Sequence, residues 1–231
     1  MRLLRNGYDR RCAHAGRTLP PKAEVTKEKE HEGYYWIAYE WSNLLLSCSR
    51  CNNKKRNQFP ITGIRVTSPT LNPDGMPDDD SRLATSPLFQ NEKPLLLHPE
   101  IDQVEDFFIF KPDGTIEALN ADPRASKTIE ICGLNRNELV IKRLKVLNEL
   151  FDAIQLELKE LAAGTIETKE ARHGIKRIFQ KLILLQRADN QYSRFGYFMF
   201  TKFDKFFTER LPPKQGEATK RFFELFRAGQ L

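Results

Sequence analysis

The pair Cys48 and Cys51 constrains the fold of this chain more than any other feature of its sequence. Two thiolates separated by two residues can bind one tetrahedral Zn²⁺ and leave two coordination positions for distant residues. The turn that they would hold fixes the start of a short helix, so that Asn52 and the first backbone N–H groups face an approaching phosphate. Basic residues follow at once and would flank that phosphate: Lys54, Lys55 and Arg56.

Cysteine usage and apolar runs indicate the compartment. Four cysteines in 231 residues do not make a disulfide framework, so the Cys–X–X–Cys favours metal or redox chemistry. The first five residues are too short an apolar run for an export signal. No apolar run approaches the roughly 18–20 residues of a membrane span. We therefore expect a cytoplasmic protein without a membrane partner.

Charge is distributed unevenly along the chain. Residues 1–60 carry 12 Lys and Arg against 6 Asp and Glu, whereas residues 61–125 carry 5 against 12. Residues 126–231 are basic again, with 20 against 13. Basic segments attract phosphates over about 8–10 Å at physiological salt. Nucleic acid is therefore a candidate ligand of either end, although basic helix faces in the C-terminal half could equally serve solvation.

Composition predicts three segments and an α+β fold. Residues 1–66 indicate a compact module of short strands and one helix, in which the aromatic run before Cys48 forms a strand. Residues 67–125 contain a Pro- and Asp-rich loop at 68–80 and then a hairpin, because Pro112-Asp113-Gly114 separates two apolar runs. Residues 126–231 form a mainly α-helical region.

The helical region shows apolar residues at intervals of three and four. Asn135 or Asn137 could cap a first helix that Gly164 ends. A second helix is expected from about 167 to 187, and a short one should end near Phe226. The repeated Phe residues after 194 are interpreted as packing rather than as a stacking surface for nucleobases. We expect this region to bind a protein partner, because its apolar residues exceed what a small N-terminal module could cover.

A family resemblance rests on residues 34–60, which read YYWIAYEWSNLLLSCSRCNNKKRNQFP. This segment resembles the second half of HNH endonucleases, in which Asn-Leu precedes Cys-X-X-Cys-(His/Asn)-X-X-Lys. Within that family it is similar to the HNH component of Septu-type antiphage defence systems, which is also found as an effector in some retrons. The stretches 110–116 (FKPDGTI) and 128–136 (TIEICGLNR) resemble the same subfamily. The resemblance implies a small zinc-containing ββα-metal module at 1–66.

The resemblance also assigns roles to individual residues. Asn43 falls on the middle Asn, which braces the loop and orients the catalytic His. Asn52 falls on the helix position that binds the catalytic ion, Mg²⁺ or another divalent cation, which would stabilise the departing oxygen. Lys55 matches the trailing Lys of the pattern.

The first half of the family pattern is altered in this chain. Thr18 and Arg17 occupy the positions of the catalytic His and its acidic neighbour, and a Thr hydroxyl is not a usable general base near neutral pH. His31 is an alternative base if its loop folds back, although a loop histidine without function is the competing interpretation. His14 could replace a missing zinc ligand. The predicted structural zinc set is then Cys12, His14, Cys48 and Cys51.

Three hypotheses follow. The chain is a metal-dependent nuclease, a degenerate HNH-like subunit that binds nucleic acid or a partner without cutting, or a zinc-ribbon protein in which the cysteines only hold the fold. The zinc ribbon does not explain the relative places of Asn43, Asn52 and Lys55. Between the other two hypotheses, Asn52 favours catalysis whereas Thr18 and Arg17 oppose it, and we favour the nuclease. The resemblance implies a Septu-type ATPase partner and nucleic acid. A retron setting would add a reverse transcriptase with its RNA–DNA hybrid.

Overall fold

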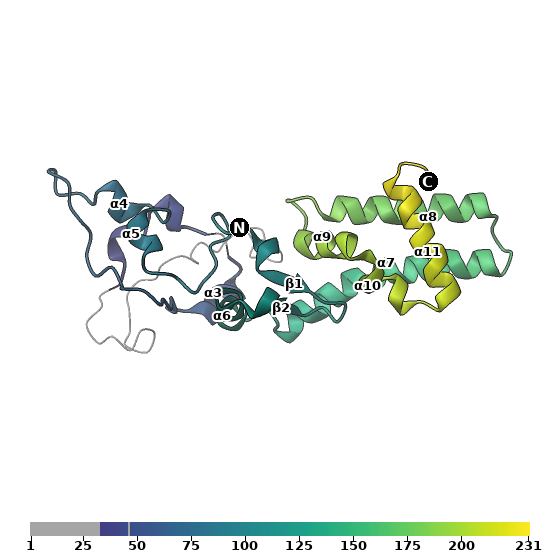
Figure 1. Ribbon diagram of the computed structural model, residues 1–231, viewed down its shortest axis with the longest axis horizontal. Coiled ribbons are helices and arrows are strands. Elements are labelled where there is room, and N and C mark those ends of the chain that lie inside the picture. Colours follow the sequence, from purple (N-terminus) through teal and green to yellow (C-terminus); the bar gives the residue numbers. More distant parts are fainter. Residues whose placement is uncertain (1–32, 46) are drawn as a thin grey trace. The chain divides into compact units, whose positions relative to one another are not determined.

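The computed structural model describes residues 33–45 and 47–231, which form two compact units (Figure 1). The first unit contains the described residues up to Ile109 together with Ile116–Asn135. The second contains Phe110–Thr115 and Arg136–Leu231. The Cys–X–X–Cys segment and most of the acidic segment therefore share one unit. No helix among the described residues is long and apolar enough to cross a membrane.

The first described segment forms two short 3-10 helices, η1 (Tyr35–Ile37) and η2 (Trp41–Asn43). The predicted strand before Cys48 is therefore wrong for residues 33–45. The reason lies in the spacing of the buried side chains. Tyr34, Ile37 and Ala38 face the core, at intervals of three and four residues rather than the two of a strand.

The rest of the first unit consists of short elements joined by loops. Its helices are α3 (Ser49–Lys55), α4 (Asp79–Arg82), α5 (Pro87–Gln90), η3 (Val104–Asp106), η4 (Leu119–Ala121) and α6 (Pro123–Cys132). The side chains of Asp78, Ser86 and Asp122 cap the first turns of α4, α5 and α6. The expected loop at 68–80 is confirmed up to Asp78, with one isolated bridge between Leu71 and Pro77.

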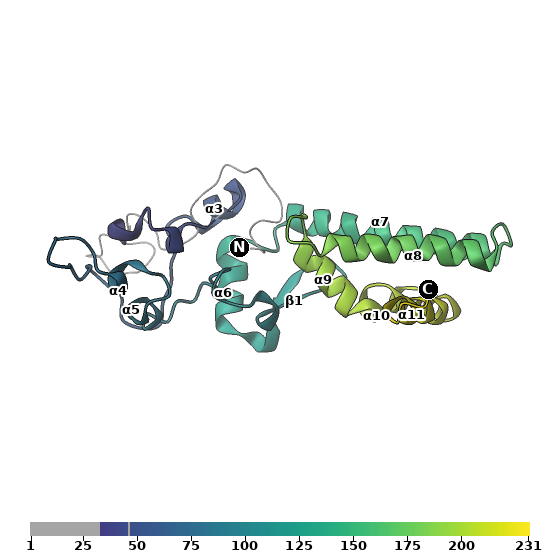
Figure 2. The ribbon, with the colours of Figure 1, turned by 90° about the horizontal axis from the view of Figure 1, so that it is seen from above.

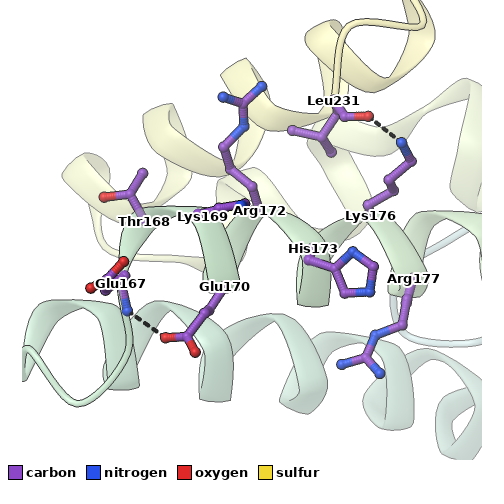
Figure 3. Close-up of a pocket in the computed structure, with 9 residues that line it drawn as sticks. All are labelled: Glu167, Thr168, Lys169, Glu170, Arg172, His173, Lys176, Arg177 and Leu231. Carbon is purple, nitrogen blue, oxygen red and sulfur yellow. Dashed lines mark hydrogen bonds between the residues drawn. The ribbon is translucent and has the colours of Figure 1, made fainter.

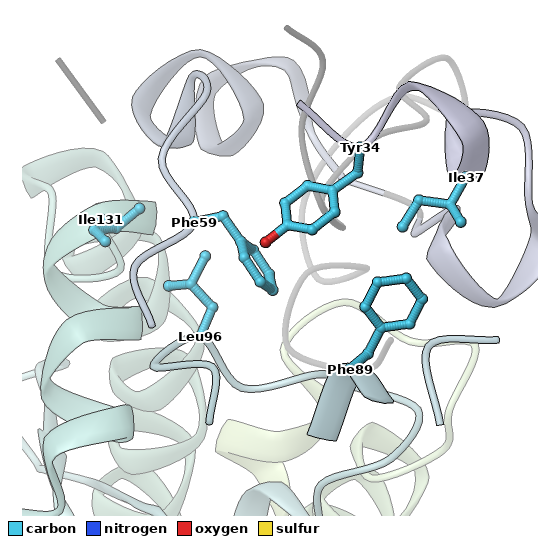
Figure 4. Packing of buried hydrophobic residues seen from close by; sticks show 6 residues of the cluster. All are labelled: Tyr34, Ile37, Phe59, Phe89, Leu96 and Ile131. Carbon is cyan, nitrogen blue, oxygen red and sulfur yellow. The ribbon is translucent and has the colours of Figure 1, made fainter. Parts of the chain in front are cut away.

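Tyr34 lies at the centre of the core of this unit (Figure 4). Its ring meets Phe59 and Phe89 edge-on, with centroids 6.0 and 6.2 Å apart. Its hydroxyl donates to Glu92 Oε1 over 2.8 Å, and that oxygen also accepts from Val66 N. A buried carboxylate is costly unless hydrogen-bonded, so these bonds allow Glu92 to lie fully inside. The other buried residues of this cluster are Ile37, Leu96 and Ile131.

The predicted hairpin is confirmed as strands β1 (Phe108–Phe110) and β2 (Ile116–Ala118). The sequence had suggested Asn135 or Asn137 as the cap of the following helix, and neither takes that position, because Asn137 is the first residue of the helix and Asn135 lies before its N-cap. Asn135 Nδ2 donates to Ile116 O and its Oδ1 accepts from Ile116 N, both over 2.8 Å. Helix α7 (Asn137–Ala162) has Arg136 at its N-cap position and begins without a side-chain cap. The amide of Asn135 is therefore used in a tertiary contact with the strand residue Ile116.

The second unit is helical. Helices α7 and α8 (Thr168–Leu185) lie side by side as a hairpin (Figures 1 and 2). Gly164, at φ +70°, lies in the turn after α7 as predicted. A capping box between Glu167 and Glu170 starts α8. The chain continues with α9 (Ser193–Thr201), α10 (Phe203–Phe206), η5 (Thr208–Arg210) and α11 (Pro213–Arg227).

Phenylalanines fill the core of the second unit. Phe203 stacks on Phe223 with centroids 3.8 Å apart, and Phe179 meets both rings nearly at right angles. The prediction that the Phe repeats pack is confirmed, because most are buried. Their burial also removes the reason for expecting them at a partner surface. The large apolar side chains exposed on α7 and α8 are Ile141, Leu156, Ile183 and Leu184.

Candidate functional site

Cys48 and Cys51 lie at the start of α3. Cys48 is the N-cap, and its Sγ accepts a hydrogen bond from Cys51 N over 3.3 Å. Both side chains are 5% exposed. Two buried sulfurs held at the first turn of one helix suit two of the four positions around a tetrahedral Zn²⁺. Cys48 and Cys51, the two predicted zinc ligands among the described residues, are therefore suited to binding the ion.

The remaining predicted ligands and the candidate base lie outside the described residues. These are Cys12, His14 and His31, together with the altered positions Arg17 and Thr18. Within 33–45 and 47–231, no group of three or more His, Cys, Asp or Glu side chains gathers around a common point. The zinc set and the base therefore stay predictions.

Asn43 fixes the turn that leads to Cys48. Its side chain is buried and Nδ2 donates to Ile37 O over 3.1 Å, which ties η2 to η1. The adjacent Ser42 is also held, because its Oγ accepts from Ala84 N over 3.0 Å. The roles that the resemblance implied for Asn43, bracing the loop and orienting a catalytic His, stay predictions.

His98 supports the same turn from the acidic segment, a contact that the sequence did not indicate. Its Nε2 lies 3.1 Å from Ser42 O, and its Nδ1 accepts from Glu100 N over 3.3 Å. These partners select the neutral tautomer with the proton on Nε2. Burial lowers the pKa of His98, and the bond to Ser42 O partly opposes that shift. His98 therefore acts as a neutral brace.

The basic residues of α3 differ in exposure. Lys54 and Arg56 are exposed and Asn52 is half-buried, whereas Lys55 is only 2% exposed. Burial lowers the pKa of Lys55 to about 8, with a smaller opposing effect from Cys132. In this conformation Lys54 and Arg56 are available to a phosphate, and Lys55 would have to leave the interior to reach one. A sequence pattern alone could not separate three adjacent cations in this way.

One relative was found among known proteins. The chain is 34% identical over 122 residues to a protein of Bacillus mycoides (strain KBAB4) named Septu protein PtuB. The chain is similar to PtuB. The expected resemblance to the Septu component is thereby confirmed. The match spans 52% of this chain but only 36% of PtuB, about a third of its length. No family model and no solved structure matches the chain.

The second unit carries an open hollow on α8, with a volume of about 1080 Å³ (Figure 3). Hydrogen bonds from Lys176 Nζ to Leu231 O and from Arg172 to Gln230 O hold residues 230–231 against α8 at this hollow. Its lining has four Lys or Arg side chains against two Glu side chains, which makes the surface weakly basic. The helical periodicity of the sequence did not indicate this surface. The lining residues are Glu167, Thr168, Lys169, Glu170, Arg172, His173, Lys176, Arg177 and Leu231.

Proposed function

We propose that this chain is a subunit of a Septu-type antiphage defence system and that its cysteine module cleaves nucleic acid as an HNH endonuclease. One observation carries the proposal. In a chain similar to Septu protein PtuB, helix α3 starts at buried Cys48 and Cys51, and Asn52 follows directly. Asn52 would then present its amide beside a turn that a Zn²⁺ held by the two cysteines would fix, and this arrangement supports the proposal.

Two metal ions belong to the proposal. A structural Zn²⁺ would be held by Cys48 and Cys51 with Cys12 and His14, and it would fix the start of α3. A divalent ion at the Asn52 amide oxygen would supply charge stabilisation for the departing oxygen. Neither ion is required for the contacts of Asn43, which positions the turn through Ile37 O.

The residues of the chain itself would bind and orient the substrate. Lys54 and Arg56 are exposed on or beside α3 and would contact the backbone of the strand to be cut. His31 is the candidate general base. Since Thr18 stands at the usual base position, the water would have to be activated from a different segment of the chain.

A degenerate, non-cleaving subunit is the second candidate function. Arg17 and Thr18 favour it, since neither can perform the chemistry of the residues normally found there. The burial of Lys55 favours it as well, because the trailing Lys of the pattern is turned away from solvent. Such a subunit would still bind nucleic acid or its partner through the same module.

Asn52→Ala separates the two candidates. A nuclease should lose phage protection and cleavage, and its zinc content and thermal unfolding temperature should remain unchanged, because Asn52 is only half-buried and its amide would face the site rather than the core. Asn53→Ala is the matched control, since Asn53 is exposed on the same helix and should retain activity. Full activity of Asn52→Ala would favour the non-cleaving subunit.

We also propose that the second unit binds a Septu-type ATPase. Ile183 and Leu184 form an exposed apolar pair on α8, 44% and 54% exposed, and contiguous apolar surface often marks an interface. Changing both to Glu should abolish co-purification with the ATPase without unfolding the unit. Gln180→Glu, at an exposed position of the same helix, is the control. Unaltered co-purification of the double variant would contradict this assignment.

A further inference from the structure

Three exposed aromatic side chains gather immediately before the cysteine module. Tyr39 is 88% exposed, Trp41 82% and Tyr35 55%. No other aromatic side chain among the described residues is exposed, and the three fall within seven consecutive positions. We call them the exposed aromatic cluster. Tyr35 also meets the ring of Trp36 edge-on, with centroids 5.2 Å apart, whereas Tyr39 and Trp41 are too exposed for burial in the hydrophobic core to explain them.

The backbone that carries the exposed aromatic cluster is held in place. Glu40 N donates to Ile37 O over 3.2 Å, and Leu44 N donates to Trp41 O over 3.1 Å. The residues that follow Trp41 are tied down as well, through the bond from Asn43 Nδ2 to Ile37 O and through the contacts of Ser42 with Ala84 and His98. A ligand that stacks on these rings therefore orders little backbone on binding.

Charge identifies the kind of ligand. Between 33 and 66 the chain carries five cations and one carboxylate, Glu40. Exposed cations lie on or directly after α3, at Arg50, Lys54 and Arg56, nine to fifteen positions after Trp41. Exposed aromatic rings followed by a basic segment match a polyanion with flat aromatic faces, which is a nucleic-acid strand. An apolar protein surface would complement the rings but not the charge.

The base faces must also be accessible. In a duplex they are covered by neighbouring base pairs, and a protein that stacks on them must first unstack or flip the base. In a single strand every base offers a face, so aromatic stacking tolerates any sequence. Exposed aromatic rings of this kind would therefore distinguish single-stranded from double-stranded nucleic acid, and not one base sequence from another.

We propose that the exposed aromatic cluster stacks unpaired nucleobases of a single-stranded or locally unpaired substrate, and that Arg50, Lys54 and Arg56 hold the phosphates that follow. This inference rests on the proposed function and narrows its substrate class. Asn43 is two residues from Trp41, so the stacked bases would lie next to the turn that positions the candidate active site.

The test measures binding of oligothymidylate to the full chain in an Asn52→Ala background, so that cleavage does not interfere. Nucleobase stacking on Trp41 should quench its fluorescence, and Trp41→Phe should remove the quenched component. Trp41→Ala and Tyr39→Ala should each weaken binding about 5- to 150-fold, the range for loss of one stacked base. Trp41→Phe should retain most of the affinity because a ring remains. A duplex of equal length should bind more weakly and quench less.

Ile64→Ala is the matched control, since Ile64 is apolar, 89% exposed and not aromatic, and binding should not change. The proposal is overturned if oligothymidylate leaves Trp41 emission unchanged, if duplex binds as tightly with equal quenching, or if only the protein partner alters that emission. Cleavage by the chain with Asn52 intact is scored separately. Loss of cleavage in Asn52→Ala without quenching would refute the stacking alone, whereas quenching with cleavage unaffected by Asn52→Ala would refute the nuclease alone.

Discussion

Replacing the buried Lys55 by Met should stabilise the first unit. The two side chains have similar length, and Met fills apolar space without an ionisable group. Burial lowers the pKa of Lys55 from 10.5 to about 8. At about 1.4 kcal/mol for each pKa unit, this shift corresponds to roughly 3 kcal/mol by which the buried ammonium opposes folding near neutral pH. Lys55→Met should therefore raise the free energy of unfolding by about that amount.

The pH dependence has a definite sign. Below about pH 8 the ammonium is charged in both states, so the penalty is complete. Between about 8 and 10.5 the unfolded chain binds more protons than the folded chain, so stability rises with pH. Above 10.5 both states are neutral and the rise ends. The advantage of Lys55→Met should therefore be largest at pH 7 and should shrink as the pH approaches 10.5.

Urea unfolding at a series of pH values measures this effect. Both tryptophans of the chain, Trp36 and Trp41, belong to the first unit, so their fluorescence reports its unfolding directly. Lys54→Met is the control, because Lys54 is the exposed neighbour on the same helix and should change stability by less than about 0.5 kcal/mol. Equal stability of Lys55→Met and the parent chain at pH 7, or a difference that does not depend on pH, would refute the reasoning.

Three further outcomes are expected. Gly63→Ala should destabilise the first unit by about 1–3 kcal/mol in the same urea titration, because its Cβ would lie 2.2 Å from Asn91 O, a backbone atom. Gly174→Ala in the second unit, where the new Cβ would meet the side chain of Glu157, should cost less when urea unfolding is followed by far-UV circular dichroism. Elemental analysis should find one zinc per chain, and Cys48→Ser should lose both the zinc and the fold of the module; zinc-free protein purified without chelators would contradict this. Thr18→His should raise cleavage of a labelled oligonucleotide if only the base position is altered, and no gain would mean either that Arg17 also blocks the metal or that the base lies elsewhere.

Local signals predicted the elements whose formation depends on adjacent residues. Pro112-Asp113-Gly114 specified the hairpin, and the helical periodicity after Asn137 specified α7 up to the turn at Gly164. The prediction was wrong where distant contacts decide the structure. The Asn135 side chain forms two hydrogen bonds with the backbone of Ile116 in β2 and does not cap a helix.

The candidate site was predictable to a similar extent. The pairing of Cys48 and Cys51 at a helix start follows from spacing alone. The aromatic run before them was taken for a strand, because aromatic residues favour strands, although its buried positions recur at helical intervals. The burial of Lys55 depends on how the rest of the first unit packs around α3, and no feature within its own segment reports that.

The division of the chain into two units limits how they can be exchanged between proteins. The hairpin turn at Phe110–Thr115 belongs to the second unit, although it precedes the last part of the first. Within the second unit, Arg143 donates to Gly114 O over 2.9 Å, and Phe110 packs against Phe195 and Phe198. A recombination break at 135 would separate these partners and leave the buried guanidinium of Arg143 without that carbonyl. Successful swaps of the helical unit must therefore transfer a six-residue turn from an earlier part of the gene.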